Sequence, residues 1–279
     1  MYTSWREKMS DEDIKNNVKN MFDEVATRYE NIDFFKISAK NIADLLPCKG
    51  VSNVLDVACG TGNVVLEYAS TFADANFDAV DISTQMLECA KEKAKEQNIT
   101  NITFYCCDIE TLDMQKQYDI VTCSYALFFL PNPIDTLKIL YAHVKTGGTL
   151  IFTSFTQNAF SPSSKILADL FESFEVKTPQ KSWKTLQTTQ EITYLCNQAD
   201  IEDFDVHEKA IRYPLSLPEW WSLNNDTAHR GMLLQLSCDD YESVKEMYFE
   251  AMQWHEDESR MVELNADTFY TIIRKGTNK

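Results

Sequence analysis

The residues with the clearest chemical meaning lie between positions 54 and 65. An apolar run ends at Asp56, and a turn of small residues with Gly60 and Gly62 leads into an amphipathic pattern that begins near Asn63. Glycine is favoured where a side chain would block access to the backbone or where φ must be positive. Because the chain has only 7 glycines in 279 residues, two of them in one strand-to-helix turn predict a ligand site at the carboxyl edge of a parallel sheet.

The spacing within this turn distinguishes between classes of ligand site. A dinucleotide site has the pattern G-x-G-x-x-G, but its third glycine would fall at Val65. A Walker-type phosphate loop needs Gly-Lys-Ser/Thr, which does not follow the turn. An ordinary turn in another doubly wound protein stays an alternative. The pattern that fits is acidic-x-small-x-Gly-x-Gly, formed by Asp56, Ala58, Gly60 and Gly62.

The sequence LDVACGTG at residues 55–62 resembles the first motif of class I S-adenosylmethionine-dependent methyltransferases. It looks especially like the small-molecule branch that includes the ubiquinone/menaquinone C-methyltransferases. The resemblance implies an α/β fold with a doubly wound, Rossmann-like sheet of seven strands, the last of them antiparallel. It also implies that S-adenosyl-L-methionine is the cofactor and that the turn contacts it through Asp56, Ala58, Gly60, Thr61 and Gly62.

Acidic residues at the ends of the next two predicted strands fit the same site. Residues 76–81 end in Asp81, about 20 residues past the glycine turn, where such folds place a ribose-binding carboxylate. Capping of the next helix is the alternative, although Ser83 could do this alone. In the family the acid after the third strand, here Asp108, meets the adenine amino group. The resemblance adds three neighbours to this part of the cofactor site, with core filling as the alternative for the methionine: Ile82, Met86 and Ile109.

Two further strands complete the pattern. Residues 118–124 read as strand four, and the segment that follows closely resembles the family's loop over the cofactor. The resemblance implies that Ser124 contacts the cofactor and that Tyr125 has a positioning role. A Gly-Gly turn at 147–148 leads into strand five. These motifs occur in the family's order and at the spacing of βαβ units over residues 50–155, which makes the assignment more specific than one short motif would.

The segments outside this core predict three structural parts. Residues 10–46 have a helical pattern, and residues 22–30 resemble the N-terminal segment of the quinone methyltransferases, in which Tyr29 would lie over the methionine end of the cofactor. A helix that only packs over the site is the alternative. Residues 163–174 and 189–199 read as helices, residues 203–212 as a strand, and residues 268–274 as the last strand. We therefore expect an N-terminal helical cover at 1–48, a Rossmann-like cofactor domain at 49–213 and 262–279, and a helical cap inserted at 214–261.

Composition limits the classes of partner. The net charge is −17, which repels phosphate backbones and disfavours a nucleic-acid substrate. The apolar runs are far shorter than a membrane span needs, and residues 1–8 lack the apolar core of a signal peptide. These features predict a cytoplasmic protein with a small-molecule substrate.

The eight cysteines raise the question of a disulfide or metal site. The sequence has no Cys-x-x-Cys and no histidine pair at ligand spacing, so we expect no metal. Reduced cysteines packed in the core are the simpler interpretation. The alternative is a thiol-binding methyltransferase that acts on arsenic, which would require several cysteines to converge on one pocket.

Methyl transfer from a sulfonium is an in-line displacement, which needs alignment and exclusion of water more than electrophilic help. Related small-molecule enzymes often have His-His in the loop after strand four, where this chain has Phe128 and Phe129, so we expect an apolar pocket. In the cap, His229 is the best candidate for a general base, with a surface or capping role as its alternative. The predicted substrate pocket under the cap adds Trp220, Trp221 and Arg230.

Two functions of different classes remain open at this point. The first is methylation of a small molecule. The second is another use of the fold, as a cofactor-dependent cyclase or as a regulatory partner of another methyltransferase. The intact set of acidic and glycine positions argues against an inactive scaffold but does not exclude unusual chemistry.

Overall fold

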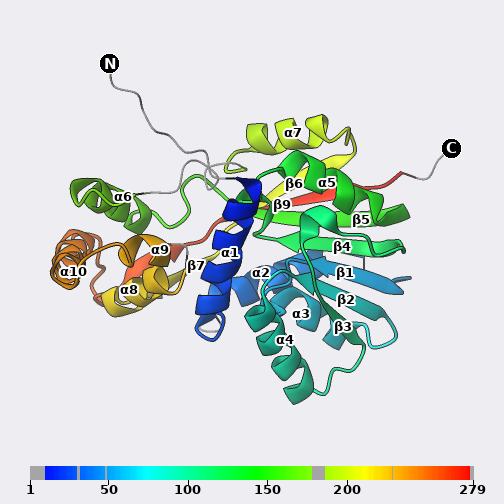
Figure 1. The fold of residues 1–279 in the computed structure, drawn as a ribbon, viewed down its shortest axis with the longest axis horizontal. Coiled ribbons are helices and arrows are strands. Elements are labelled where there is room, and N and C mark those ends of the chain that lie inside the picture. The colour runs from blue at the N-terminus through cyan, green and yellow to red at the C-terminus, as the bar shows by residue number, and fades with distance from the viewer. Residues whose placement is uncertain (1–9, 30–31, 48, 178–185, 228, 277–279) are drawn as a thin grey trace.

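A seven-stranded sheet forms the centre of the molecule (Figure 1). The computed structural model describes residues 10–29, 32–47, 49–177, 186–227 and 229–276. The strand order is β3-β2-β1-β4-β5-β9-β6, with β1 to β5 parallel and β9 antiparallel to both β5 and β6. The predicted fold, including the antiparallel last strand, is therefore confirmed. The strands are β1 (Asn53–Val57), β2 (Asn76–Asp81), β3 (Ile102–Cys106), β4 (Tyr118–Ser124), β5 (Val144–Phe155), β6 (Phe204–Lys209) and β9 (Thr268–Arg274).

Helices cover both faces of this sheet and bury its apolar side chains. On one face, α5 (Pro133–Ala142) and α7 (Thr189–Gln198) pack through Leu137 and Ile192. On the other face, α2 (Asp33–Leu45), α3 (Asn63–Thr71) and α4 (Thr84–Glu96) pack through residues such as Ile42, Val65 and Leu87. Strands buried on both faces read as continuous apolar runs, which is why β1 and β4 were visible in the sequence.

A second apolar cluster lies beside the sheet. It contains α6 (Ser163–Ser173), α8 (Leu217–Asn225), α9 (Arg230–Leu233) and α10 (Cys238–Gln253). A separate two-stranded sheet joins it, formed by β7 (Arg212–Leu215) and β8 (Val262–Asn265) in antiparallel register. The predicted cap thus consists of helices that pack against a short two-stranded ribbon. The sequence indicated the helices but not the ribbon, because its strands are only four residues long.

The ribbon is attached to the main sheet by Asp267. Its buried carboxylate accepts a hydrogen bond from the Ile211 backbone amide at 3.1 Å and pairs with the Arg212 guanidinium at 2.5 Å. The predicted strand at 203–212 is therefore divided in two: β6 ends at Lys209, and the chain then turns away into β7.

Helix α1 (Asp11–Val25) lies across the space between the sheet and the cap (Figure 1). Ser10 and Asp13 begin it with a capping box, in which each side chain accepts from the backbone amide of the other. Its C-terminal end is tied to the cap, because Arg28, just beyond the helix, pairs with Asp226 at 3.2 Å. This helix and Tyr29, which lies just beyond it, are the parts of the N-terminal segment that reach the candidate site.

Candidate functional site

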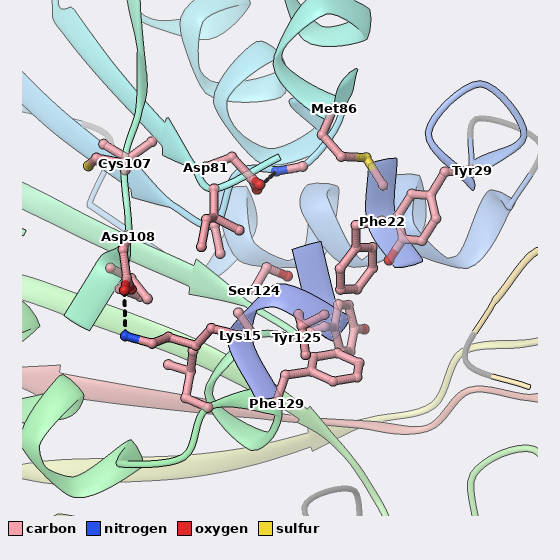
Figure 2. Close-up of a pocket in the computed structure, with 18 residues that line it drawn as sticks. Lys15, Phe22, Tyr29, Asp81, Met86, Cys107, Asp108, Ser124, Tyr125 and Phe129 are labelled. Atoms are coloured by element: carbon pink, nitrogen blue, oxygen red, sulfur yellow. Dashed lines mark hydrogen bonds and ion pairs between the residues drawn. The ribbon is translucent and has the colours of Figure 1, made fainter. Parts of the chain in front are cut away.

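A pocket lies between α1 and the carboxyl ends of β1 to β4 (Figure 2). In the sheet β1 stands between β2 and β4, and the helices that follow β1 and β4 cover opposite faces. This is the topological switch point at which open α/β sheets bind ligands. The residues that line the pocket are Lys15, Val18, Phe22, Tyr29, Ala58, Gly60, Val80, Asp81, Ile82, Met86, Cys107, Asp108, Ile109, Ser124, Tyr125, Ala126, Phe129 and Leu130.

Asp81 organises the glycine turn. One carboxylate oxygen accepts a hydrogen bond from the Gly60 amide at 2.8 Å, and the other accepts from the Ser83 amide at 2.8 Å. Burial raises the pKa of Asp81, and the hydrogen bonds from Ser83 and Gly60 oppose that rise. The Ser83 hydroxyl caps α4 by accepting from the Met86 amide. Asp81 therefore fixes both the glycine turn and the start of α4, and it also faces the pocket.

Asp56 lies behind the turn and is buried. Its Oδ1 accepts from the Thr122 hydroxyl at 2.6 Å, whereas its Oδ2 makes no hydrogen bond within the described residues. Burial raises the pKa of Asp56 to about 7, against the effect of the Thr122 hydrogen bond. Asp56, Thr61 and Gly62 do not line the pocket, so of the predicted turn residues Ala58 and Gly60 are the ones exposed to a ligand.

The turn leaves room for a ligand against its backbone. Gly60 has φ +55°, and a Cβ placed there would meet no atom within 4 Å. Ala58 also has a positive φ of 52°, an uncommon conformation for a residue with a side chain. A strained, open backbone with a buried acceptor oxygen behind it fits a polar ligand that approaches the main chain closely.

The opposite wall of the pocket is aromatic. Phe22, Tyr29, Tyr125 and Phe129 gather at the end away from Asp108 (Figure 2). Tyr125 has φ +52°, its ring stacks on Phe155 with centroids 4.4 Å apart, and its hydroxyl lies 2.8 Å from the Thr268 hydroxyl. Burial raises the pKa of Tyr125 well above its usual value. Its ring is therefore held in one orientation and its phenol remains protonated at neutral pH.

Residues 49–200 match the family described as "Methyltransferase domain". This chain belongs to that methyltransferase domain family. The resemblance indicated by the glycine turn is confirmed, and the pocket lies within the matched domain apart from the wall supplied by α1 and Tyr29.

Among curated relatives, a malonyl-[acyl-carrier protein] O-methyltransferase of Bacillus cereus is 27% identical over 60% of this chain and 60% of its own length. A ubiquinone biosynthesis O-methyltransferase of Coxiella burnetii is 36% identical over 44% of this chain and 51% of its own length. The chain thus spans between half and two thirds of the length of these relatives.

Among solved structures, a Haemonchus contortus phosphoethanolamine N-methyltransferase 2, in complex with phosphomonomethylethanolamine and S-adenosylhomocysteine, has a TM-score of 0.58 and 16% identity. The match covers 97% of this chain and 61% of that chain. At this identity the likeness concerns the fold.

In this methyltransferase-family chain, the residues predicted for the substrate pocket separate into two groups. Phe129 lines the pocket, whereas Phe128 is buried in the core beside it. Trp220 and Trp221 both lie inside the cap, where their indole N–H groups bind the Val262 carbonyl and the Tyr241 hydroxyl at 3.1 Å. The sequence predicted both tryptophans in the substrate pocket. Both instead hold the cap together, because a buried indole needs both packing and a hydrogen-bond acceptor.

His229 and Arg230 also lie outside the pocket lining. The His229 ring packs near Phe171, and burial lowers its pKa to about 4. Arg230 binds Glu24 of α1, with its Nε 2.7 Å from the carboxylate. His229 stays neutral inside the cap, and Arg230 is already paired with α1. We therefore assign both residues a structural role and do not include them in the candidate site.

The pocket contains residues that the sequence did not single out. Lys15 reaches it from α1, with its Nζ 2.6 Å from Asp108 and 3.0 Å from Glu110. Cys107 is the only cysteine in the pocket lining among the described residues. Those residues contain no cluster of three or more histidine, cysteine, aspartate or glutamate side chains that could hold a metal ion. The seven thiols that the structure describes therefore do not converge as an arsenic site would require. No helix in the described part of the chain is long and apolar enough to cross a membrane.

Proposed function

We propose that this chain is an S-adenosylmethionine-dependent methyltransferase that acts on a small-molecule acceptor. One observation carries the proposal: at the switch point of the sheet, the carboxylate of Asp81 and the open backbone at Gly60 face the same pocket, 2.8 Å apart. When bound, S-adenosylmethionine supplies an activated methyl group. The family membership and the chemistry of these groups support a nucleoside ligand here.

Each proposed cofactor contact uses a group that the pocket presents. Asp81 would hold the ribose hydroxyls, and Asp108 the adenine amino group. Met86 would pack against the base, and Tyr29 would cover the methionine end. Asp56, Thr61 and Gly62 do not line the pocket and would support the turn from behind. The remaining proposed contacts are Ala58, Gly60, Ile82, Ile109 and Ser124.

For the acceptor we propose a small, largely apolar molecule at the aromatic end of the pocket. Phe22, Tyr125 and Phe129 would exclude water there. An apolar, dry pocket favours methyl transfer from a sulfonium, because the positive charge disperses during the displacement. Tyr125 would position the acceptor with its ring, since its hydroxyl is already bound to Thr268. The relatives act, by their names, on a malonyl-carrier conjugate and in ubiquinone biosynthesis, and we propose an acceptor of comparable small-molecule type for this chain.

We propose three parts: a helical cover at 1–48, a cofactor domain at 49–213 and 262–279, and a cap at 214–261. Helix α6 and the β7–β8 ribbon pack with the cap, although these bounds place α6, β8 and part of β7 in the cofactor domain. We further propose that the protein works in the cytoplasm and does not act on nucleic acid. Seven free cysteines in the described part of the chain support a reducing compartment. The net charge of −17 supports the proposal that the protein does not act on nucleic acid, because it repels phosphate groups.

Replacing Asp81 by Ala tests the proposal. Loss of a charge-assisted hydrogen bond of about 1.5–3 kcal/mol should weaken S-adenosylmethionine binding by roughly tenfold or more in calorimetry. Asp78→Asn is the matched control, because Asp78 is a buried acid of the same strand that binds Tyr118 and Lys116 outside the pocket. The control should lower stability and leave the affinity of the folded protein unchanged. Equal affinity in wild type and Asp81→Ala would refute the assigned site.

A further inference from the structure

Lys15 is shared between two carboxylates at the rim of the pocket. Its Nζ lies 2.6 Å from Asp108 Oδ2 (Figure 2) and 3.0 Å from Glu110 Oε2. Its side chain is 22% exposed. Hydrogen bonds to Asp108 and then Glu110 raise the pKa of Lys15 to about 12. The side chain is therefore a cation at neutral pH and forms the only direct ionic link from α1 to the pocket lining among the described residues.

The two partners of Lys15 differ in what they offer a ligand. Asp108 lines the pocket, whereas Glu110 does not. Glu110 is fixed away from the pocket, because its Oε1 accepts from the Asn132 amide at 3.2 Å and its side chain is only 11% exposed. Lys15 thus binds Asp108, whose carboxylate is available to a ligand, and Glu110, whose carboxylate is not.

Helix α1 has attachments that do not involve Lys15. At its C-terminal half, the Asp23 carboxylate accepts from the Ser83 hydroxyl at 2.6 Å. At its N-terminus, Asp11 accepts from the Asn132 side-chain amide at 3.1 Å. These contacts hold the helix over the pocket when the bond between Lys15 and Asp108 is broken.

We propose that Lys15 is a positioning residue that latches the cofactor pocket: it holds Asp108 until a ligand takes that carboxylate, and it then stays bound to Glu110 and adds this ion pair to the other attachments that keep α1 over the pocket. The inference rests on the proposed function, because it takes the pocket to be the cofactor site. It predicts that Lys15 slows both association and dissociation of the ligand, since the side chain blocks Asp108 before binding and retains the covering helix afterwards.

Ligand association and dissociation rates, measured by surface plasmon resonance on the immobilised full chain, test the latch. Lys15→Met should accelerate both rates by about twofold to fivefold, the scale that a partly exposed ion pair can supply. Lys15→Arg keeps the cation and should restore rates close to wild type. Lys19→Met is the matched control on the same helix, because Lys19 pairs with Asp23 at 2.6 Å and does not line the pocket; its rates should stay at the wild-type level.

The choice of ligand separates a latch from a general charge effect. S-adenosylhomocysteine lacks the sulfonium charge, so a change in the pocket's potential would alter binding of S-adenosylmethionine but not of this analogue. A latch predicts faster association of both ligands in Lys15→Met. Added salt should also accelerate association of S-adenosylhomocysteine, whose net charge is zero, with the wild type but not with Lys15→Met, since salt screens an exposed ion pair.

Glu110→Gln isolates the second half of the latch. This variant keeps a side-chain oxygen for the Asn132 amide but loses the charge that retains Lys15. We expect its dissociation rate to rise towards that of Lys15→Met, while its association rate changes little because Asp108 still holds the lysine. A thermal melt of each variant separates a loss of folding from a change in rates.

Unchanged rates for S-adenosylhomocysteine in Lys15→Met would overturn the latch. Equal acceleration in Lys19→Met would overturn it as well, since Lys15 would then be no different from its neighbour. If the wild type bound neither ligand, the proposed function would fail first and the latch with it. Wild-type binding with unaltered Lys15→Met rates would reject the latch alone.

Discussion

Gly60 and Gly62 both have positive φ, yet the structure gives them different roles. At Gly60 an added Cβ would meet nothing within 4 Å, and the residue lines the pocket. At Gly62, with φ +83°, a Cβ would lie 3.1 Å from the Ala90 Cβ and 3.3 Å from Leu66. The first glycine therefore keeps space for a ligand, and the second allows α3 and α4 to pack closely.

Alanine substitutions should separate these roles. Gly60→Ala places a methyl group on the pocket wall and should weaken S-adenosylmethionine binding by roughly tenfold, with a stability cost of about 1 kcal/mol for the left-handed backbone. Gly62→Ala should instead destabilise the fold by about 1–3 kcal/mol through overpacking and the same backbone strain, with a smaller effect on affinity. Calorimetry and chemical denaturation measure the two quantities. The opposite pattern would mean that the roles are reversed.

Single residues differ in how far the sequence could place them. Asp81 was predicted in the site because it ends a strand about 20 residues past the glycine turn, and Asp108 because the resemblance places an acid after the third strand. Lys15 was not, because it lies 93 residues from Asp108 and no local pattern marks a helix lysine as facing a pocket. Trp220 and His229 were assigned by chemical type alone. Their placement depends on which side of the cap packs inward, and the sequence does not encode that locally.

At the scale of elements, the cap is a packed unit with its own core. Trp220 and Tyr248 are fully buried there, and the β7–β8 ribbon carries the unit on the edge of the main fold. The helices were predictable from apolar spacing. The ribbon was not, because Arg212–Leu215 is stabilised by pairing with Val262–Asn265 and by Asp267, all distant in sequence.

His229 should make the stability of this cap depend on pH. Its folded pKa is about 4, below the usual 6.5. The unfolded chain therefore takes up a proton as the pH falls through 6.5 while the folded cap stays neutral, so stability present above pH 6.5 is lost towards pH 4. The loss is about 2–3 kcal/mol. His229→Gln should remove this part of the dependence in melts between pH 7.5 and 4.5, and His255→Gln, an exposed position, should not. Parallel curves for wild type and His229→Gln would contradict the assignment.

At the scale of the whole molecule, one edge of the sheet collects the ends of four strands, while α1 joins this edge to the cap (Figure 1). The doubly wound sheet of seven strands with an antiparallel last strand was expected from the resemblance to the methyltransferases, whereas the order of its strands came from the structure. The position of the cap was not, since it depends on contacts such as Arg28 with Asp226 and Arg230 with Glu24. The chain has a net charge of −17. The aromatic end of the pocket is instead apolar, which suits a small apolar acceptor.

Transfer of a labelled methyl group tests the central claim most directly. The wild-type chain and Asp81→Ala are incubated with S-adenosylmethionine labelled at the methyl carbon and a set of small apolar acceptors or a metabolite extract, and products are followed by mass spectrometry. The proposed function predicts label in a small molecule, accumulation of S-adenosylhomocysteine, and loss of both in Asp81→Ala. A substrate that changes while the cofactor stays intact, as in a cyclase, would contradict the claim, and so would a cofactor that binds without any turnover, as in a regulatory partner.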